Sequence, residues 1–550
     1  MTDPIIQTKT CRHCQKSFDI TQWDLDFYDK ISRWLPWYQE SPHWEGEGSG
    51  VRIPTPTLCP ECRQRRRLSF RNERNLYRRT CDASGKQIIS IYSPDKPYKV
   101  YDQKIWWSDS RDPMSYGRDF NFTRSFTEQF GELMKEVPQL PLINDDWRLS
   151  ENCTFTNDFA LWKNCYMCFH MWEAENDLYC YFCNTSKELI DCNIVTWWSS
   201  YSYECIIGSN LYKCKYLIKS INCNECLYGV QLSWCSNCFW CYGLQNKQYC
   251  INNEQHTKEE YFQRIKHLEK EDFKKYFFTI PWVIDLIKKP YIINSQSYEW
   301  DNLINCNQCT GTNLFNCNGV KYADWCDRLI DCYDVFSVRK SEWCYEWVTP
   351  DNWYQVQHSI YSWNCINTIY TVSCHNSSHL FWCVGLRNKS YCIFNKQYTK
   401  QEYEELVPKI IAHMESTGER GEFFHPSLSP FWYNETVAQE YFPLQSITDS
   451  SEWLEIRDLN NSINFWTFWY HRSTYEAPKP VSDNVIQWKD LPAHIEEVDD
   501  SILQSAIACE VTGKLFRIQP QELVFYRKHN IPLPHKHPDQ RHLERLALRR

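Results

Sequence analysis

Residues 205–258 read CIIGSNLYK CKYLIKSIN CNECLYGVQ LSWCSNCFW CYGLQNKQY CINNEQHTK when they are written in groups of nine. Each group begins with cysteine except one, which begins with Leu232. Residues 365–400 repeat the pattern as CINTIYTVS CHNSSHLFW CVGLRNKSY CIFNKQYTK. A short fixed period is typical of a solenoid, in which each coil repeats the one before it. The sequence therefore predicts a mainly β fold with a cysteine-rich β-solenoid (β-helix-like) core.

The coil length follows from the same pattern. We expect about eighteen residues per coil, with one group of nine on each side, because nonapeptide β-helices are built in this way. Cysteine suits a narrow interior, since it is small and has only a weak donor to satisfy. Tryptophan, tyrosine and asparagine would then form ladders on the surface.

The two cysteine-periodic blocks are copies of each other. WCYGLQNKQYCINNEQHTKEEY matches WCVGLRNKSYCIFNKQYTKQEY, and LIDC at 189–192 matches LIDC at 329–332. Each block is followed by a capping-box pattern, Thr257 with Glu260 and Thr399 with Glu402, which predicts a helix that closes the solenoid. Pro408 should kink the second helix or end it early.

The solenoid cysteines also have ligand spacing. C-x-x-C pairs suggest zinc or iron–sulfur ligation, and stacked cysteines could form disulfides, so both alternatives stay open beside packing. Packing is favoured because Cys226, Cys235 and Cys238 become Thr, Ser and Leu in the second copy. The pairs and triplets with this spacing are Cys165/Cys168, Cys180/Cys183, Cys223/Cys226, Cys235/Cys238/Cys241 and Cys306/Cys309.

Two C-x-x-C knuckles stand apart from the solenoid, near the start of the chain. CRHC and CPEC supply four cysteines, and a tetrahedral zinc ion takes four such ligands. We therefore predict one structural Zn²⁺ in an N-terminal zinc ribbon. Its ligands are Cys11, Cys14, Cys59 and Cys62.

An arginine-rich segment follows the second knuckle as RQRRRLSFRNERNLYRR. Arginine pairs with phosphate and neighbouring rings can stack on bases, so the segment suggests RNA or DNA binding. A solvated helix paired with acidic parts of the chain is an equal alternative. The arginines are Arg63, Arg65, Arg66, Arg67, Arg71, Arg74, Arg78 and Arg79.

The C-terminus resembles a second copy of the ribbon. CQKSFDITQWDLDFY from Cys14 aligns with TGKLFRIQPQELVFY from Thr512, and Cys509 and His537 occupy two of the four ligand positions. Residues 81–107 hold a third near-copy, in which only Cys81 is a good ligand. We expect both copies to be degenerate ribbons held by packing.

Composition and charge restrict the classes of function that the protein can have. The 550 residues include 30 cysteines, and we find no run of eighteen apolar residues and no secretory signal at the start, so we expect a cytoplasmic protein without a transmembrane helix. Residues 1–80 carry net charge +4 and residues 501–550 carry +5, which leaves −18 for the rest of a total of −9. Basic ends on an acidic body suggest terminal binding elements.

Three stretches resemble an uncharacterised family of cysteine-rich zinc-ribbon and β-solenoid proteins of small-genome uncultivated bacteria. They are CPECRQRRRLSFRNERNLYRRTCDASGKQIISIYSPD, SPFWYNETVAQEYFPL and CEVTGKLFRIQPQELVFYRKHNIPLPHKHPDQRHLERL. The resemblance implies the same domain layout and the zinc site at the two N-terminal knuckles. It implies no activity.

The predicted layout has seven parts and no catalytic constellation. They are a zinc ribbon with a basic extension (1–80), a degenerate ribbon and linker (81–150), a first solenoid block (151–255), a capping helix and linker (256–300), a second solenoid block (301–398), a capping helix and linker (399–500) and a degenerate ribbon with a basic tail (501–550). The favoured function is a non-enzymatic zinc-binding scaffold that presents its solenoid to a protein partner. The alternatives are a nucleic-acid-binding protein and a thiol or metal buffer.

Overall fold

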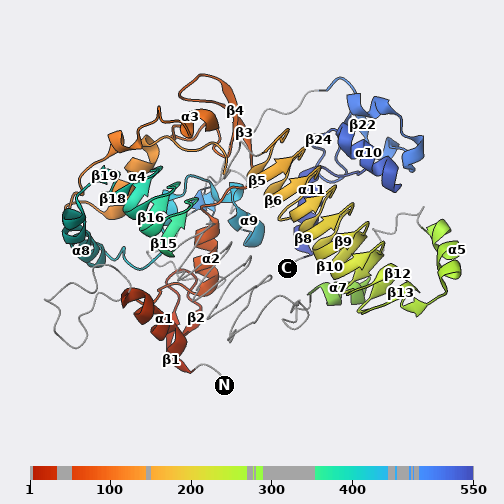
Figure 1. Cartoon of the computed structure of the whole chain (residues 1–550), viewed down its shortest axis with the longest axis horizontal. Helices are drawn as coiled ribbons and strands as arrows, with labels where there is room; N and C mark the ends of the chain where they lie inside the picture. The colour runs from red at the N-terminus through yellow and green to blue at the C-terminus, as the bar shows by residue number, and fades with distance from the viewer. Residues whose placement is uncertain are drawn as a thin grey trace. The chain divides into compact units, whose positions relative to one another are not determined.

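The computed structural model describes residues 4–33, 53–143, 150–268, 277, 280–288, 354–443, 453–454, 470–471, 475 and 482–548 (Figure 1). The chain divides into two compact units. The first unit joins Met1–Leu142 with Ile292–Tyr475, and the second joins Ile143–Tyr291 with Glu476–Arg550. The first part of the predicted second block, with Cys306, Cys309 and LIDC at 329–332, lies outside the described residues.

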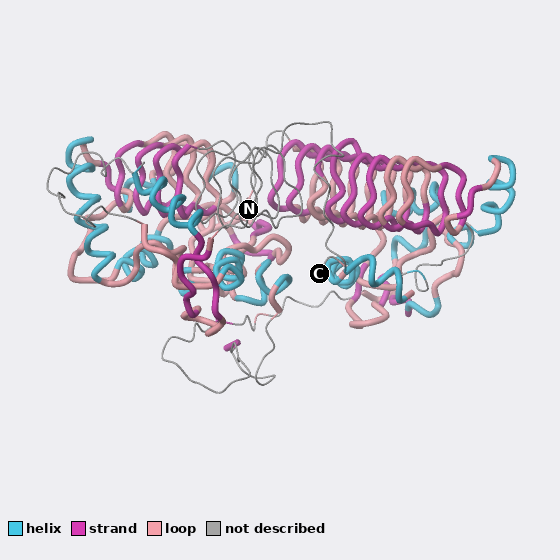
Figure 2. The backbone as a smooth tube through the Cα atoms, turned by 90° about the horizontal axis from the view of Figure 1, so that it is seen from below, coloured by secondary structure: helices cyan, strands magenta, loops and turns pink. Residues whose placement is uncertain are grey.

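The second unit is built on a parallel β-solenoid, which confirms the prediction of a mainly β fold with a solenoid. Its strands are hydrogen-bonded in chain order, and only the last pair is antiparallel (Figure 2). They are β5 (Asn157–Lys163), β6 (Phe169–Glu175), β7 (Asn184–Lys187), β8 (Asn193–Ser200), β9 (Ile206–Tyr212), β10 (Lys215–Asn224), β11 (Leu227–Val230), β12 (Ser236–Tyr242), β13 (Gln248–Ile251) and β14 (Glu254–Gln255).

The coil length predicted from the nine-residue period is wrong. Lys215 pairs with Leu227, and Leu227 pairs with Phe239, so a coil holds twelve residues rather than eighteen. A residue with positive φ recurs every third position, as at Tyr216 and Lys219, which divides each coil into four units of three. Nine residues are three of these four units, so cysteines nine apart lie at neighbouring corners of successive coils.

The left-handed residues are held by hydrogen bonds between coils. This conformation costs a residue other than glycine about 1–2 kcal/mol. The N–H of Asn164 donates to the carbonyl of Glu151 at 2.9 Å, and the N–H of Tyr179 donates to Tyr166 at 3.0 Å. Asparagine tolerates the conformation best, and Asn164 donates through its side chain to Asn176 at 3.0 Å. The corner asparagines therefore form a polar ladder as expected, whereas corner tyrosines such as Tyr216 and Tyr228 are buried rather than on the surface.

In the regular coils, the side chain that follows a left-handed residue usually lies inside the coil. Cys205 follows Glu204, is fully buried, and has its sulfur 3.5 Å from the carbonyl oxygen of Tyr203 and 3.6 Å from that of Cys214. Ser202 fills the same kind of position, where its hydroxyl donates to Ser200 at 3.1 Å. A small side chain with one donor thus fits the interior, as the packing interpretation expects.

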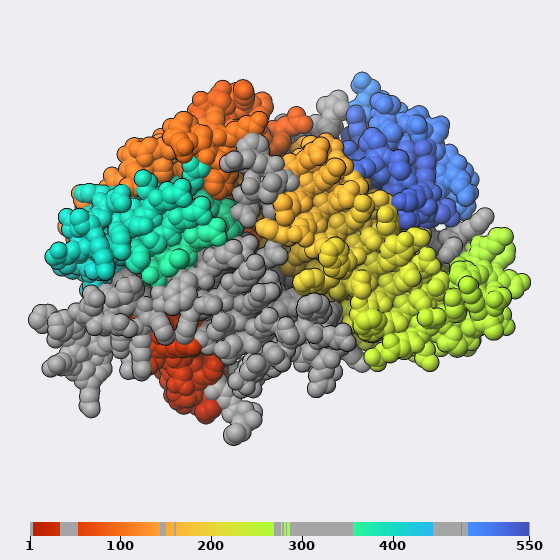
Figure 3. All heavy atoms as spheres, viewed as in Figure 1, coloured from red at the N-terminus to blue at the C-terminus, as the bar shows by residue number. Residues whose placement is uncertain are grey.

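The C-terminal segment packs on this solenoid. Figure 3 shows these residues, in blue, against the gold strands of the same unit. The segment contains β22 (Val485–Gln487), β23 (Ala506–Ala508), β24 (Leu515–Phe516), α10 (Pro520–His529) and α11 (Pro538–Ala547), with 3-10 helices at Trp488–Asp490, Ile495–Glu497 and Asp500–Gln504. Helices α5 (Lys258–Leu268) and α7 (Pro281–Lys288) complete the unit.

The first unit contains a second parallel solenoid with the same twelve-residue register, since Ile366 pairs with Ser378. Its strands are β15 (Tyr354–Ile360), β16 (Ile366–Val372), β17 (Ser378–Val384), β18 (Ser390–Ile393) and β19 (Lys396–Gln397). Helix α8 (Lys400–Ser416) follows and begins at a capping box formed by Thr399 and Glu402. It continues past Pro408 to Ser416, so of the two predicted effects of this proline the early end is wrong.

Helix α4 (Phe126–Glu136), from the chain before this solenoid, packs on it, and so does Phe424 from the chain after it, with its ring centroid 5.4 Å from that of Tyr370. Phe126 of α4 lies with its ring centroid 3.6 Å from that of Trp382, and Phe130 lies 4.6 Å from the same ring. The other elements of the unit are β1 (Ile5–Thr10), β2 (Ser17–Thr21), α1 (Gln22–Arg33), α2 (Pro60–Leu68), β3 (Tyr77–Thr80), β4 (Gln87–Ser90), α3 (Gln103–Trp106), α4 (Phe126–Glu136), α9 (Val437–Tyr441), β20 (Trp453–Leu454) and β21 (Tyr470–His471), with 3-10 helices at Pro113–Tyr116, Pro426–Leu428 and Tyr433–Glu435.

Candidate metal centre

The first knuckle is the turn between β1 and β2, which pair antiparallel. The N–H of Cys11 donates to the carbonyl of Lys16 at 2.9 Å, and the N–H of Gln15 donates back to the carbonyl of Cys11 at 3.0 Å. Gln15 is left-handed, with φ of 61°, which closes the turn. The N–H of Cys14 points at the sulfur of Cys11, 3.5 Å away. The turn therefore holds both cysteines of CRHC toward one point.

The second knuckle is the start of α2. Cys59 is the residue before the helix, Pro60 occupies its first turn, and Cys62 lies one turn further on. The N–H of Arg12 donates to the carbonyl of Thr57 at 2.9 Å, which ties the two knuckles together. The helix start thus presents its two sulfurs to the hairpin.

All four predicted ligands meet. The sulfur atoms of Cys11, Cys14, Cys59 and Cys62 lie within 4.8 Å of one another, and the sulfurs of Cys14 and Cys59 are 3.6 Å apart. Cys11, Cys59 and Cys62 are buried and Cys14 is half-buried. Phe18, Ile20 and Leu58 pack around the cluster. This group of thiols could hold a metal ion, as the spacing of the two knuckles predicts.

Cys11, Cys59 and Cys62 compete for ionisation. Hydrogen bonds from Cys59 and Cys62 lower the pKa of Cys11, because they stabilise its thiolate. The hydrogen bond to Cys11 raises the pKa of Cys59 to about 12, and burial adds to the increase. One thiolate therefore suppresses the next, and a bound cation would remove that competition by neutralising several at once.

The arginines after the second knuckle lie mostly inside the first unit. Of the eight, Arg63, Arg66, Arg67, Arg71 and Arg79 are buried, Arg65 and Arg74 are half-buried and Arg78 is exposed. The Arg66 guanidinium donates to Glu422 at 2.7 Å and, through Nε, to the carbonyl of Phe424 at 2.7 Å. Arg71 forms an ion pair with Glu73, and both are fully buried. These contacts give the segment a structural role, and nucleic-acid binding through it stays a prediction.

The two near-copies of the ribbon keep the knuckle turn. The N–H of Cys81 donates to Lys86 at 2.8 Å, and the N–H of Cys509 donates to Lys514 at 3.0 Å, as Cys11 does to Lys16. The position of Cys59, just before a helix, is taken by Asp102 before α3 and by His537 before α11.

Both replacement residues cap their helices. The Asp102 carboxylate accepts from the N–H of Lys104 at 2.9 Å, and His537 Nδ1 accepts from the N–H of Asp539 at 3.1 Å. A side chain that caps a helix thus stands in each of these segments at the place that Cys59 has before α2. Among the residues that the structure describes, neither Cys81 nor Cys509 belongs to a group that could hold a metal.

The solenoid cysteines are arranged differently from the knuckles. Within the described part of both solenoids they are free thiols, and all but the half-buried Cys153 are buried. None of them belongs to a group of three or more potential ligands within 4.8 Å in that part of the chain. The three-residue unit explains their C-x-x-C spacing, because positions three apart are adjacent interior corners of one coil.

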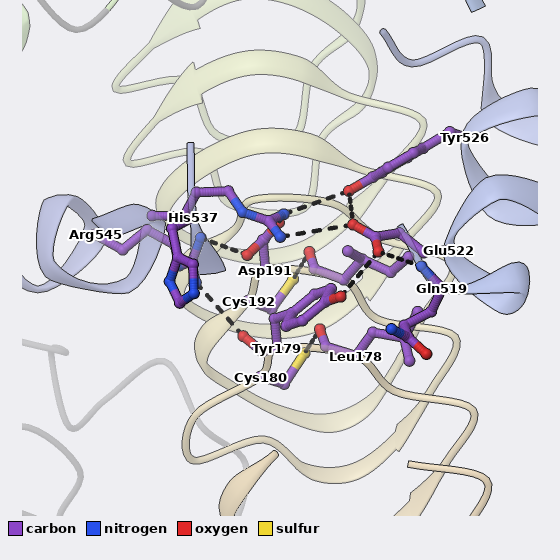
Figure 4. Close-up of polar contacts among 12 residues, drawn as sticks. Leu178, Tyr179, Cys180, Asp191, Cys192, Gln519, Glu522, Tyr526, His537 and Arg545 are labelled. Carbon is purple, nitrogen blue, oxygen red and sulfur yellow. Dashed lines mark hydrogen bonds and ion pairs between the residues drawn. The ribbon is translucent and has the colours of Figure 1, made fainter. Parts of the chain in front are cut away.

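A buried charge network in the second unit escaped the sequence analysis. Arg541 and Arg545 of α11 both form ion pairs with Asp191 at a solenoid corner, the second at 2.8 Å. Figure 4 shows Glu522 beside them, accepting from the hydroxyls of Tyr179 at 2.9 Å and Tyr526 at 2.7 Å. Burial raises the pKa of Glu522, although Arg541 opposes the increase. The network fastens the C-terminal segment to the solenoid.

No protein-family model, curated protein or solved structure matches this chain. Across the described residues, no helix has the length and apolar character needed to cross a membrane. The tetracysteine cluster therefore carries the functional argument for the first unit on its geometry alone.

Proposed function

We propose that this chain is a non-enzymatic scaffold in which one structural zinc ion organises the N-terminal ribbon, while the solenoids present their surfaces to a partner. The tetracysteine cluster carries the proposal. The group contains four sulfurs and no fifth ligand side chain, which suits a closed tetrahedral site. Such a site favours a zinc ion or an iron–sulfur centre.

The position of the cluster explains why a scaffold would need the ion. Cys59 directly precedes helix α2, and Arg66 of this helix donates hydrogen bonds to Glu422 and Phe424, more than 350 residues further along the chain. Ser69, which follows the helix, accepts a hydrogen bond through its carbonyl from Ser429 at 2.7 Å. An ion that fixes the start of α2 thus supports the packing of the whole first unit.

Metal analysis of the full chain tests the proposal. We expect one zinc per chain for the wild type and loss of the ion in Cys62→Ser. Cys81→Ser is the matched control, since Cys81 lies in the same kind of turn without partner sulfurs, and it should keep the ion. Absence of zinc, or a Cys62→Ser variant that keeps the full metal content, would contradict the structural site. Several ions per chain would instead favour the thiol or metal buffer.

A further inference from the structure

The regular coil of the first solenoid is interrupted at one place among the described residues. Asn184 pairs with Thr196, twelve residues ahead, whereas Ser186 pairs with Ser199, thirteen ahead. The extra residue lies at Trp197 and Trp198, which both have positive φ, where the next coil has only Asn210 at this corner. A bulge that adds one residue commonly redirects a side chain for use at the surface.

The bulge places its tryptophans in solvent. Trp198 is 76% exposed, the largest fraction among the exposed large hydrophobic residues of the described chain, and Trp197 is 45% exposed. Exposing an indole forfeits a large burial free energy, so an insertion that does so is costly for the fold itself. The inserted residue therefore adds no buried surface to the solenoid.

A second exposed indole lies on the same corner of the solenoid. Ser209, Ile221 and Ser233 stack in register, and the corner residues that follow them are Asn210, Asn222 and Trp234. Trp234 is 55% exposed. The two tryptophan corners are three coils apart, about 14 Å at a strand spacing of about 4.8 Å. We call Trp198, Asn210, Asn222 and Trp234 the indole–amide strip.

The amides between the indoles are ordered. Asn210 Nδ2 donates to Asn222 Oδ1 at 2.8 Å, which fixes the two side chains in a ladder. An asparagine amide has two N–H donors and an oxygen with two lone pairs, so each side chain keeps capacity for further hydrogen bonds. The strip thus has a flat apolar ring at each end and ordered donors and acceptors between them.

Two lysines near the strip form ion pairs. Lys213 pairs with Glu225 at 3.6 Å, and Lys187 pairs with Glu175 at 2.9 Å. A nucleic-acid surface needs cations that are free to replace counterions on phosphates. These ion pairs compensate the two lysines, and the exposed Lys247 beyond Trp234 adds a single positive charge, so the surroundings of the strip carry little net charge. A neutral partner matches it better than a polyanion.

We propose that the indole–amide strip binds a neutral glycan chain running along the solenoid axis. A pyranose ring offers one face of C–H groups, which suits an indole ring, and equatorial hydroxyls, which suit the asparagine amides. The rise of the coils lays successive contacts along a line, as a linear oligosaccharide requires. This inference rests on the proposed scaffold function, since it names the partner that the solenoid surface presents itself to.

Affinity electrophoresis of the full, metal-loaded chain in gels that contain neutral polysaccharides tests the inference, with β-glucan, mannan and galactomannan as probes. The wild type should be retarded by at least one of them. Trp234→Ala, and deletion of Trp198 to restore the twelve-residue register, should each weaken the retardation at least about tenfold, which is about 1.4 kcal/mol. Phe262→Ala is the matched control, because Phe262 is an exposed aromatic on α5, and it should leave binding unchanged.

The outcomes separate this inference from the scaffold proposal. Lack of retardation by all three polysaccharides, or equal retardation of wild type and both strip variants, overturns the glycan site while a zinc content of one leaves the scaffold standing. Binding to single-stranded RNA or heparin that falls with salt overturns it in favour of a polyanion partner. Thermal unfolding of each variant shows that a lost interaction is not a lost fold.

Discussion

Replacing Asp191 by asparagine should loosen the C-terminal segment from the first solenoid. The substitution keeps the shape of the side chain, and asparagine tolerates the left-handed backbone that Asp191 adopts at φ of 56°. It removes the only carboxylate that pairs with Arg545 among the described residues, whereas Arg541 keeps Glu522. One buried arginine then lacks a counter-charge.

The expected cost follows from that burial. Asp191 is fully buried in the network, and the arginine side chains are 2% and 4% exposed. Breaking a buried pair by removing one partner costs about 3–5 kcal/mol. Glu188→Gln is the matched control, since Glu188 pairs with Lys528 at 2.9 Å near the surface, and such pairs contribute at most about 1 kcal/mol.

Amide hydrogen exchange in α10 and α11 measures the effect locally. Protection there should fall at least about a hundredfold in Asp191→Asn and at most several-fold in Glu188→Gln. Adding Arg545→Met to Asp191→Asn leaves Arg541 with Glu522 as a balanced pair, so protection should partly recover. Equal protection in Asp191→Asn and Glu188→Gln would refute the argument that the network fastens the segment.

Three further predictions concern the metal, the interior carboxyl and the interior thiols. Chelation of the metal should raise hydrogen exchange in α2 and leave α11 unchanged, because the four sulfurs lie only in the first unit; equal loss in both helices would contradict this. Burial raises the pKa of Asp177 well above its ordinary value. The folded state therefore keeps a proton that the unfolded chain releases above about pH 3.9, and stability should fall as the pH rises from there. Asp177→Asn should flatten that slope in urea titrations at several pH values, and an unchanged slope would assign it to other groups. Cys205→Ser should fold and lose no more than about 1 kcal/mol in the same titrations, because Ser202 shows that a hydroxyl makes the interior hydrogen bonds; unfolding would indicate that the thiol has a role beyond packing.

The sequence predicted the elements whose evidence is local. The two C-x-x-C knuckles predicted the group formed by Cys11, Cys14, Cys59 and Cys62, because each knuckle is one turn. The cysteine repeat predicted a solenoid but not its coil. The signal for the coil was present at Cys214, Cys226, Cys238 and Cys250, which are twelve apart. The nine-residue spacing concealed the twelve-residue coil, because cysteine occupies neighbouring corners of successive coils as readily as the same corner.

Contacts between residues far apart in the sequence could not be predicted from the sequence. Arg66 finds Glu422 and Arg541 finds Asp191 across about 350 residues, and neither pairing leaves a local pattern. Arginines that resemble a phosphate-binding run by composition are thus mostly buried by partners that only the tertiary fold supplies. The capping roles of Asp102 and His537 were equally hidden, because a capping residue and a degenerate ligand look alike in one sequence.

The three-residue unit makes the solenoid sensitive to the phase of its sequence. Inserting twelve residues would add one coil and leave each later side chain on its own face, whereas inserting three would turn all later residues by a quarter of a coil. Placed shortly before Asp191, such an insertion would turn Asp191 away from α11, and placed between Trp198 and Trp234 it would move Trp234 out of the line of Trp198. Apart from a local bulge such as that at Trp197 and Trp198, the solenoid can therefore lengthen without turning its faces only by whole coils of twelve residues.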